Sequence, residues 1–159
     1  MIDEQSFIRE IEAMERMLYR VSRSLLSSRE ECGDAVQEAL SKAWAKRAHV
    51  EESYFRPWLM RIVINECHNI GRRKKRVTPV AEIAGGSCPA PDVPDERLRM
   101  ALDALPEKLR MPLVLHYLEG FTVTESARIL HVPQGTVKSR LRLARECLRK
   151  KWEELDHED

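Results

Sequence analysis

Apolar side chains recur every three or four positions through the first third of the chain, which is the spacing of one helix face. The first amphipathic stripe consists of Phe7, Ile11, Met14, Leu18, Val21 and Leu25. The second consists of Val36, Ala39, Leu40, Ala43 and Trp44. Asp34, followed three residues later by Gln37, has the pattern of a capping box. We therefore predict one long helix and a second helix that begins near Asp34.

A third helix is predicted after a polar stretch at residues 46–54. Pro57 suits the first turn of a helix because its missing N–H has no partner there. The apolar positions that follow are Leu59, Ile62, Val63, Cys67 and Ile70. They lead into a run of five basic residues at 72–76, so this helix is predicted to end in positive charge.

The second half of the chain also has helical spacing, beginning with Leu98, Ala101, Leu102 and Leu105. Pro106 is predicted to open a helix that runs through Leu118 and that accommodates Pro112 by bending or starting late. Gly120 suits the left-handed position that follows a helix end.

Residues 124–150 have the layout of a helix-turn-helix: a short helix at 124–130, a turn at 131–133 and a longer helix from about 134. Ala127 is small where the two helices must cross, and Val137 is apolar where the second helix packs back. His131 stands where the turn often holds glycine, and histidine tolerates a positive φ better than branched residues do. The spacing predicts a module that reads duplex DNA.

The longer helix carries an apolar stripe beside a basic one. The apolar stripe is Val137, Leu141, Ala144 and Leu148, and the basic stripe is Lys138, Arg142, Arg145 and Arg149. Side chains near its start would meet base edges in a major groove, while the basic stripe would meet phosphates. The predicted DNA contacts are Thr136, Lys138, Ser139, Arg140, Arg142 and Arg145. A merely solvated basic face is the alternative.

Residues 77–96 separate the two helical halves. They contain four prolines, a Gly-Gly pair and four acids, with no lysine or arginine. We therefore predict an all-α protein of two small helical domains joined by a flexible linker. The domains cover residues 1–76 and 97–152, the second is the helix-turn-helix, and an acidic tail covers 153–159.

Charge distribution adds to this division, although the net charge of the 159-residue chain is only +1. Residues 56–76 hold seven basic side chains against one acid, and residues 136–152 hold seven against one. Two basic segments on either side of an acidic spacer predict two surfaces that contact a polyphosphate.

Other classes of protein find little support in the sequence. The four cysteines have no paired spacing and no histidine pair beside them, so we expect no metal site and no cofactor. There is no nucleophile beside a base and no glycine-rich phosphate loop, which argues against an enzyme. The acidic, polar start and the short apolar runs predict a cytoplasmic protein without membrane contact of its own.

Four segments together resemble the two-domain sigma factors of the extracytoplasmic function (ECF) group. They are DAVQEALSKAW at 34–44, FRPWLMRIVINECHNIGRRKKR at 55–76, ALDALPEKLRMPLVLHYLEGFTVTESARIL at 101–130 and VPQGTVKSRLRLARECLRK at 132–150. The resemblance implies that the first domain is sigma region 2, which binds core polymerase and the minus-ten promoter element. It implies that the second domain is sigma region 4, which binds the minus-thirty-five element.

The resemblance also implies partners and site residues. The partners are core RNA polymerase, through its clamp and flap regions, promoter DNA and an anti-sigma factor. The implied polymerase contacts are Asp34, Gln37, Glu38, Leu40 and Lys42. Asp34 and Gln37 could instead only cap their own helix, so the other three test this role better.

The implied contacts to the minus-ten element begin at the polar loop, which in this family captures an unpaired base. They are Tyr54, Arg56, Trp58, Arg61, Asn65, Arg72 and Arg73. An aromatic ring such as Tyr54, Phe55 or Trp58 can stack on a flipped base, but Trp58 also fits an ordinary packing role. The acidic linker would occupy the RNA path of the polymerase or serve only as a solvated tether.

The sequence thus predicts a factor that binds polymerase, recognises both promoter elements and promotes DNA melting. Two alternatives remain open. One is a stand-alone helix-turn-helix regulator that binds an operator as a dimer. The other is an adaptor whose basic faces bind acidic proteins.

Overall fold

The computed structural model describes residues 2–77 and 96–157, and these residues form helices and connecting turns without a strand. The chain divides into two compact units, Met1–Pro89 and Ala90–Asp159. The predicted all-α fold with two small helical units is confirmed. Residues 78–95 of the predicted linker and residues 158–159 of the predicted tail lie outside the described residues.

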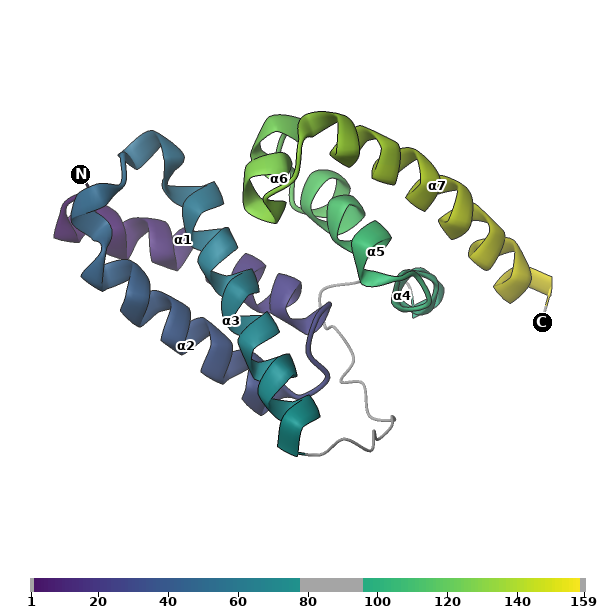
Figure 1. The fold of residues 1–159 in the computed structure, drawn as a ribbon, viewed down its shortest axis with the longest axis horizontal. Coiled ribbons are helices and arrows are strands. Elements are labelled where there is room, and N and C mark those ends of the chain that lie inside the picture. Colours follow the sequence, from purple (N-terminus) through teal and green to yellow (C-terminus); the bar gives the residue numbers. More distant parts are fainter. Residues whose placement is uncertain (1, 78–95, 158–159) are drawn as a thin grey trace. The chain divides into compact units, whose positions relative to one another are not determined.

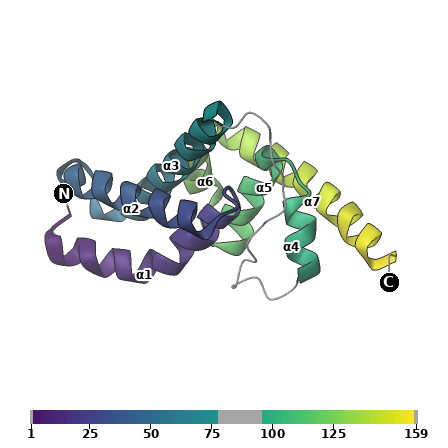
Figure 2. The same cartoon turned by 90° about the horizontal axis from the view of Figure 1, so that it is seen from below.

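The first unit is a three-helix arrangement of α1 (Glu4–Arg23), α2 (Arg29–Ala45) and α3 (Phe55–Val77). Two short 3-10 helices, η1 (Arg47–His49) and η2 (Glu52–Tyr54), form the predicted polar loop between α2 and α3. Each helix contacts the other two, and α2 and α3 lie side by side in both views (Figures 1 and 2). Fully buried side chains from all three form the core, among them Met14, Leu18, Ala35, Ala39, Leu59 and Val63.

The start of α2 corrects one prediction. Ser28 lies in the extended region, and its hydroxyl accepts a 3.1 Å hydrogen bond from the backbone N–H of Glu31. The helix therefore begins at Arg29, because the buried Cys32 and Ala35 continue its apolar face toward the N-terminus. The prediction that α2 begins near Asp34 was wrong, and Asp34 lies exposed within the helix.

The second unit contains α4 (Glu96–Asp103), α5 (Glu107–Leu113), α6 (Val123–Leu130) and α7 (Gln134–His157). Helices α4, α5 and α6 all pack against α7, as Figure 1 shows for α5 and α6. Their shared core cluster consists of Leu102, Leu105, Leu113, Ala127, Val137, Leu141 and Ala144.

The predicted helix through Leu118 changes its winding rather than bending or starting late. Pro112 is buried inside α5 and has no N–H to donate. Directly after α5 the chain widens into a π-helix, η3 (Val114–Leu118), and the N–H of Glu119 donates a 3.0 Å bond to the carbonyl of Val114. Gly120 follows with φ 82°, as predicted.

The helix-turn-helix is formed by α6, a tight turn and α7. A capping box starts α6: the Thr122 hydroxyl accepts from the N–H of Glu125, and the Glu125 carboxylate accepts from the N–H of Thr122. His131 adopts φ 62° and ψ 46°, the left-handed conformation expected of it. The Val132 N–H then closes the turn on the Ala127 carbonyl at 3.0 Å.

Candidate nucleic-acid and polymerase interfaces

The outer face of α7 presents the basic residues predicted to bind DNA. Val137, Leu141 and Ala144 are buried in the core cluster. The opposite side exposes Lys138, Ser139, Arg142 and Arg145, while Thr136 and Arg140 are half-buried. The predicted segregation of apolar and basic stripes is observed, and it leaves basic side chains exposed along the second helix of the helix-turn-helix.

Arg145 has a partner that the sequence did not reveal. Its guanidinium donates a 2.6 Å hydrogen bond to the hydroxyl of Tyr117 and lies 5.9 Å from the centre of that ring. Tyr117 belongs to η3 and is 53% exposed. An aromatic residue at the end of an apolar run gives no sequence signal for this role, because its partner lies 28 residues later in the chain.

The predicted minus-ten contacts lie at η2 and along the first half of α3. Tyr54 is the last residue of η2, and Arg56, Trp58, Arg61 and Asn65 follow on α3. Arg56 donates a 2.8 Å hydrogen bond from Nε to the Glu10 carboxylate of α1. This pair lies at the surface, so Arg56 is held in place while part of its charge is compensated.

Trp58 combines packing with exposure. Its ring lies 5.8 Å from that of the fully buried Phe55, yet the residue itself is only half-buried. Phe55 in turn packs edge-on against Phe7 of α1 at 5.5 Å. The aromatic cluster therefore anchors the start of α3 to α1, and one part of the Trp58 surface remains accessible.

The predicted polymerase contacts lie along one groove between α2 and α3, which has a volume of about 1010 Å³. Four of the five predicted contacts line it, namely Asp34, Gln37, Glu38 and Lys42, together with Glu31 of the same helix. Leu40 is half-buried and is not part of the lining. Arg72 and Arg73 of α3, which the sequence assigned to DNA, line the same groove.

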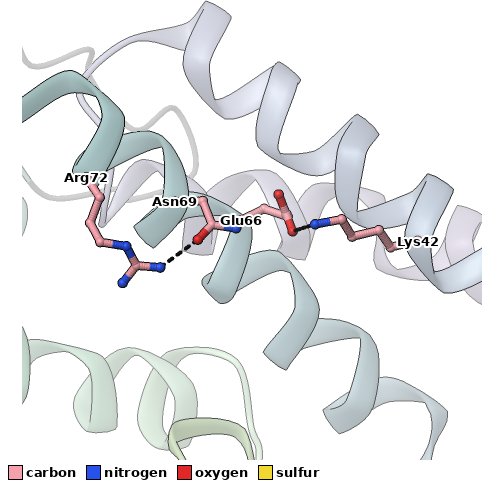
Figure 3. Close-up of polar contacts among 4 residues, drawn as sticks. All are labelled: Lys42, Glu66, Asn69 and Arg72. Atoms are coloured by element: carbon pink, nitrogen blue, oxygen red, sulfur yellow. Dashed lines mark hydrogen bonds and ion pairs between the residues drawn. The ribbon is translucent and has the colours of Figure 1, made fainter. Parts of the chain in front are cut away.

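An ion pair joins the two walls of this α2–α3 groove. Lys42 Nζ lies 2.5 Å from Glu66 Oε2, and Figure 3 shows the two side chains pointing toward each other. The Glu66 side chain is only 5% exposed, whereas that of Lys42 is 44% exposed. The hydrogen bond to Glu66 raises the pKa of Lys42 above its ordinary value. Glu66 was missed as a site residue; its signal was a lone acid on the apolar face that also carries Val63 and Cys67.

In the described parts of the chain, no group of three or more histidine, cysteine or acidic side chains could hold a metal ion. No helix among the described residues combines the length and the apolar character that a membrane span requires.

The fold and these surfaces define a helix-turn-helix DNA-binding protein with a second helical unit that carries a charged groove. The family described as Sigma-70 region 2 matches residues 11–77, and the family described as Sigma-70, region 4 matches residues 95–148.

Curated relatives agree with both matches. The ECF RNA polymerase sigma-E factor of Escherichia coli strain K12 is 33% identical over 141 residues, which cover 77% of this chain and 74% of that protein. The ECF RNA polymerase sigma factor SigW of Bacillus subtilis is 28% identical and covers 96% of this chain and 92% of its own length. The chain belongs to the ECF sigma factor family.

Solved structures share the fold. The sigma factor RpoE of Bartonella quintana, solved in complex with the anti-sigma factor NepR, matches with a TM-score of 0.78 and 27% identity. That match covers 92% of this chain and 96% of RpoE. CnrH, solved with the cytosolic domain of CnrY, matches the fold with a TM-score of 0.72 at 22% identity, over 99% of this chain and 92% of CnrH. As an ECF sigma factor, the protein associates with core RNA polymerase and promoter DNA in transcription initiation.

Proposed function

We propose that the two helical units divide promoter recognition between them. The second unit, residues 97–152, binds the minus-thirty-five element as duplex DNA through α7. The first unit, residues 1–76, binds core polymerase and the minus-ten element. The observation that carries this division is the basic outer face of α7 behind a correctly closed turn, since a helix with this geometry fits the major groove.

In this proposal the start of α7 reads bases and its later turns bind phosphates. Thr136, Ser139 and Arg140 lie nearest the turn, where recognition helices place the side chains that reach base edges. Lys138, Arg142 and Arg145 extend the cationic surface to the DNA backbone. Phosphate contacts fix the register of the helix on the duplex, and base contacts supply the sequence preference.

The first unit melts the minus-ten element by trapping an unpaired base at η2 and the start of α3. Tyr54 and the accessible part of Trp58 offer aromatic surface, and stacking on such a ring stabilises a flipped base by about 1 to 3 kcal/mol. Arg56, Arg61 and Asn65 supply charge and hydrogen bonds beside it. Binding energy alone drives this opening, so the proposal includes no covalent chemistry and no cofactor.

The polymerase clamp binds the acidic face of α2, with Asp34, Gln37 and Glu38 as contacts, and region 4 meets the flap. Leu40 and Lys42 belong to the same predicted set, although Lys42 is paired with Glu66. Both promoter and polymerase are cytoplasmic, and we propose that the protein acts there. The similar RpoE of Bartonella quintana was solved with an anti-sigma factor, so we also propose an anti-sigma partner for this chain.

A gel shift with and without core polymerase tests the proposed function. A duplex that carries the cognate promoter is incubated with the full chain alone, with core polymerase alone and with both. We expect specific retardation only with both, because each unit alone makes few contacts. Tight specific binding by the chain alone would contradict the proposal and favour an operator-binding regulator.

A further inference from the structure

The α2–α3 groove contains charged side chains that form no ion pair within it. Lys42 is paired with Glu66, and Lys74 of α3 lies 3.5 Å from Glu31 of α2. Among the described residues, the side chains of Asp34, Glu38 and Arg73 make no hydrogen bond or ion pair. The charges without an ion pair are thus segregated, with Asp34 and Glu38 on the α2 wall and Arg72 and Arg73 on the α3 wall, where Arg72 is hydrogen-bonded only to the neutral Asn69.

Arg73 lies about 80° to 120° around α3 from Arg61, Asn65 and Arg72. It follows Glu66 by two helical turns, and its charge is close enough to Lys42 to lower the pKa of that ammonium. Arg72 instead follows Asn65 by two turns and Arg61 by three, so it shares their face. The resemblance to ECF sigma factors implied minus-ten contacts for both arginines, although helical spacing places them about 100° apart.

The side chain of Arg72 also behaves differently. Its Nη2 donates a 2.6 Å hydrogen bond to Asn69 Oδ1 of its own helix, and it does not join the Lys42–Glu66 pair (Figure 3). Arg72 is therefore held along α3 at the edge of the groove. The guanidinium of Arg73 is therefore available to a partner that binds in the groove beside Asp34 and Glu38.

We propose that Arg73 contacts core polymerase rather than DNA, by binding an acidic group on the same polymerase segment whose basic groups face Asp34 and Glu38. This inference rests on the proposed function, in which the α2 wall binds polymerase. The partner segment must then carry cations on one side and at least one carboxylate on the other. A cationic DNA-binding role for Arg73 would place phosphates against Asp34 and Glu38, where like charges repel.

The segregated charges also set the orientation of the partner. A partner segment with only cationic side chains would pair with the acids of α2 but would be repelled by Arg73. A partner segment with only acidic side chains would be repelled by the acids of α2. A polymerase segment that carries both positive and negative side chains can therefore bind with its cations toward α2 and its carboxylate toward Arg73. The reversed orientation would place like charges together and is disfavoured.

The test compares Arg73→Ala with Lys75→Ala in the full chain. Lys75 is an exposed cation of the same helix that does not line the groove, so its replacement makes the same change in net charge. Affinity for core polymerase is measured without DNA, at several salt concentrations. Arg73→Ala should weaken binding roughly five- to tenfold with a shallower salt dependence, as expected for the loss of one close charge pair. Lys75→Ala should change it by less than about twofold.

A second measurement separates polymerase binding from DNA binding. Holoenzymes are assembled at saturating concentrations of each variant, and their affinity for promoter DNA is compared. Arg73→Ala should then match the wild type, whereas Arg72→Ala should bind the promoter more weakly. Thermal melting of each free variant verifies that the fold is intact, and Arg73→Lys, which retains the charge, should recover most of the polymerase affinity.

Glu38→Arg distinguishes failure of this inference from failure of the proposed function. If Glu38→Arg weakens polymerase binding and Arg73→Ala does not, the assignment of Arg73 is wrong while the α2 site stands. If neither variant has an effect, the groove does not bind polymerase and both are wrong. Weaker promoter binding by saturated Arg73→Ala holoenzyme would return Arg73 to the DNA contacts and overturn the inference.

Discussion

The hydroxyl of Tyr117 accepts a 2.6 Å hydrogen bond from the guanidinium of Arg145, a residue 28 positions later in the chain. The bond joins η3 to the outer face of α7, where Arg145 is one of the proposed DNA contacts. A guanidinium that is already oriented loses less side-chain entropy when it binds a phosphate.

Tyr117→Phe should therefore weaken binding of the minus-thirty-five element by holoenzyme, by up to about fivefold, the value of one hydrogen bond of about 1 kcal/mol. Arg145→Ala should have a larger effect. The control is Tyr117→Phe in the Arg145→Ala background, which should cause no further loss. Additive losses would show that Tyr117 acts on DNA binding independently of Arg145.

Replacement of Lys138 and replacement of Arg140, both near the start of α7, should change DNA binding in different ways. Lys138→Ala should weaken binding to all upstream sequences alike and reduce the slope of log affinity against log salt by about one. Arg140→Ala should cost about 1 to 3 kcal/mol on the preferred site and relax the preference at one base pair. Binding isotherms of holoenzyme on a set of singly substituted promoters, at several salt concentrations, measure both. A uniform loss for Arg140→Ala would assign that residue to the backbone instead.

The Lys42–Glu66 pair predicts an asymmetric cost of substitution. Lys42→Met leaves a buried carboxylate without its partner and should destabilise the fold more than Glu66→Gln, which removes the buried charge itself. The double change Lys42→Met with Glu66→Leu should recover much of the loss. Chemical denaturation of the variants gives the three free energies of unfolding. Equal stability of Lys42→Met and the wild type would mean that the pair does not form in solution.

The same pair has a defined pH dependence. The folded state raises the pKa of Lys42 above its ordinary value of 10.5. Its contribution to stability is therefore complete below pH 10.5 and is lost as the pH rises through the raised value.

The turn between α6 and α7 and the turn before α6 should respond to substitution with opposite signs. His131 adopts φ 62°, so His131→Gly should stabilise the fold by about 1 kcal/mol by removing the strain of a left-handed side chain. Gly120 has φ 82°, and no other side chain lies within 4 Å of the place a Cβ would take, so Gly120→Ala isolates backbone strain and should destabilise by about 1 kcal/mol. Urea denaturation measures both changes. A destabilised His131→Gly variant would show that the imidazole makes contacts worth more than the strain.

The N-terminus of α1 should contribute to stability only above acid pH. The Asp3 carboxylate accepts a 2.7 Å hydrogen bond from the N–H of Ser6, and this bond lowers the pKa of Asp3 below 3.8. The charged cap therefore stabilises the fold above pH 3.8 and loses its effect as the pH falls through the lowered pKa. The melting temperatures of the wild type and Asp3→Asn should differ at pH 7 and converge as the pH falls below 3.8 and through the lowered pKa. Glu12→Gln, at an exposed position within the helix, is the control and should show no such convergence.

The sequence predicted the helices and the helix-turn-helix because periodic apolar positions, proline and glycine act locally. It misplaced the start of α2 because Asp34 and Gln37 have a capping pattern, whereas the side chain that caps the helix is that of Ser28. The choice depended on which apolar residues the other helices bury, and Cys32 and Ala35 settle it only in three dimensions. The roles of Glu66 and Tyr117 depend on pairings between helices, with Lys42 and with Arg145, and no local pattern records such pairings.

At the π-helix η3, the number of residues affects the orientation of the chain that follows. A π turn accommodates one more residue than an α turn, so the single extra residue sets the rotational phase at which the chain enters Gly120 and then α6. Replacement of an exposed residue such as Leu118 leaves that phase unchanged. Deletion of one residue from Val114–Leu118 would either rewind η3 as a regular α turn, which changes where Tyr117 points, or rotate everything after it by about 100°. The number of residues between α5 and the DNA-reading helix α7 therefore contributes to the geometry of the second unit independently of side-chain identity, whereas Tyr117 of the same segment contributes through its hydroxyl.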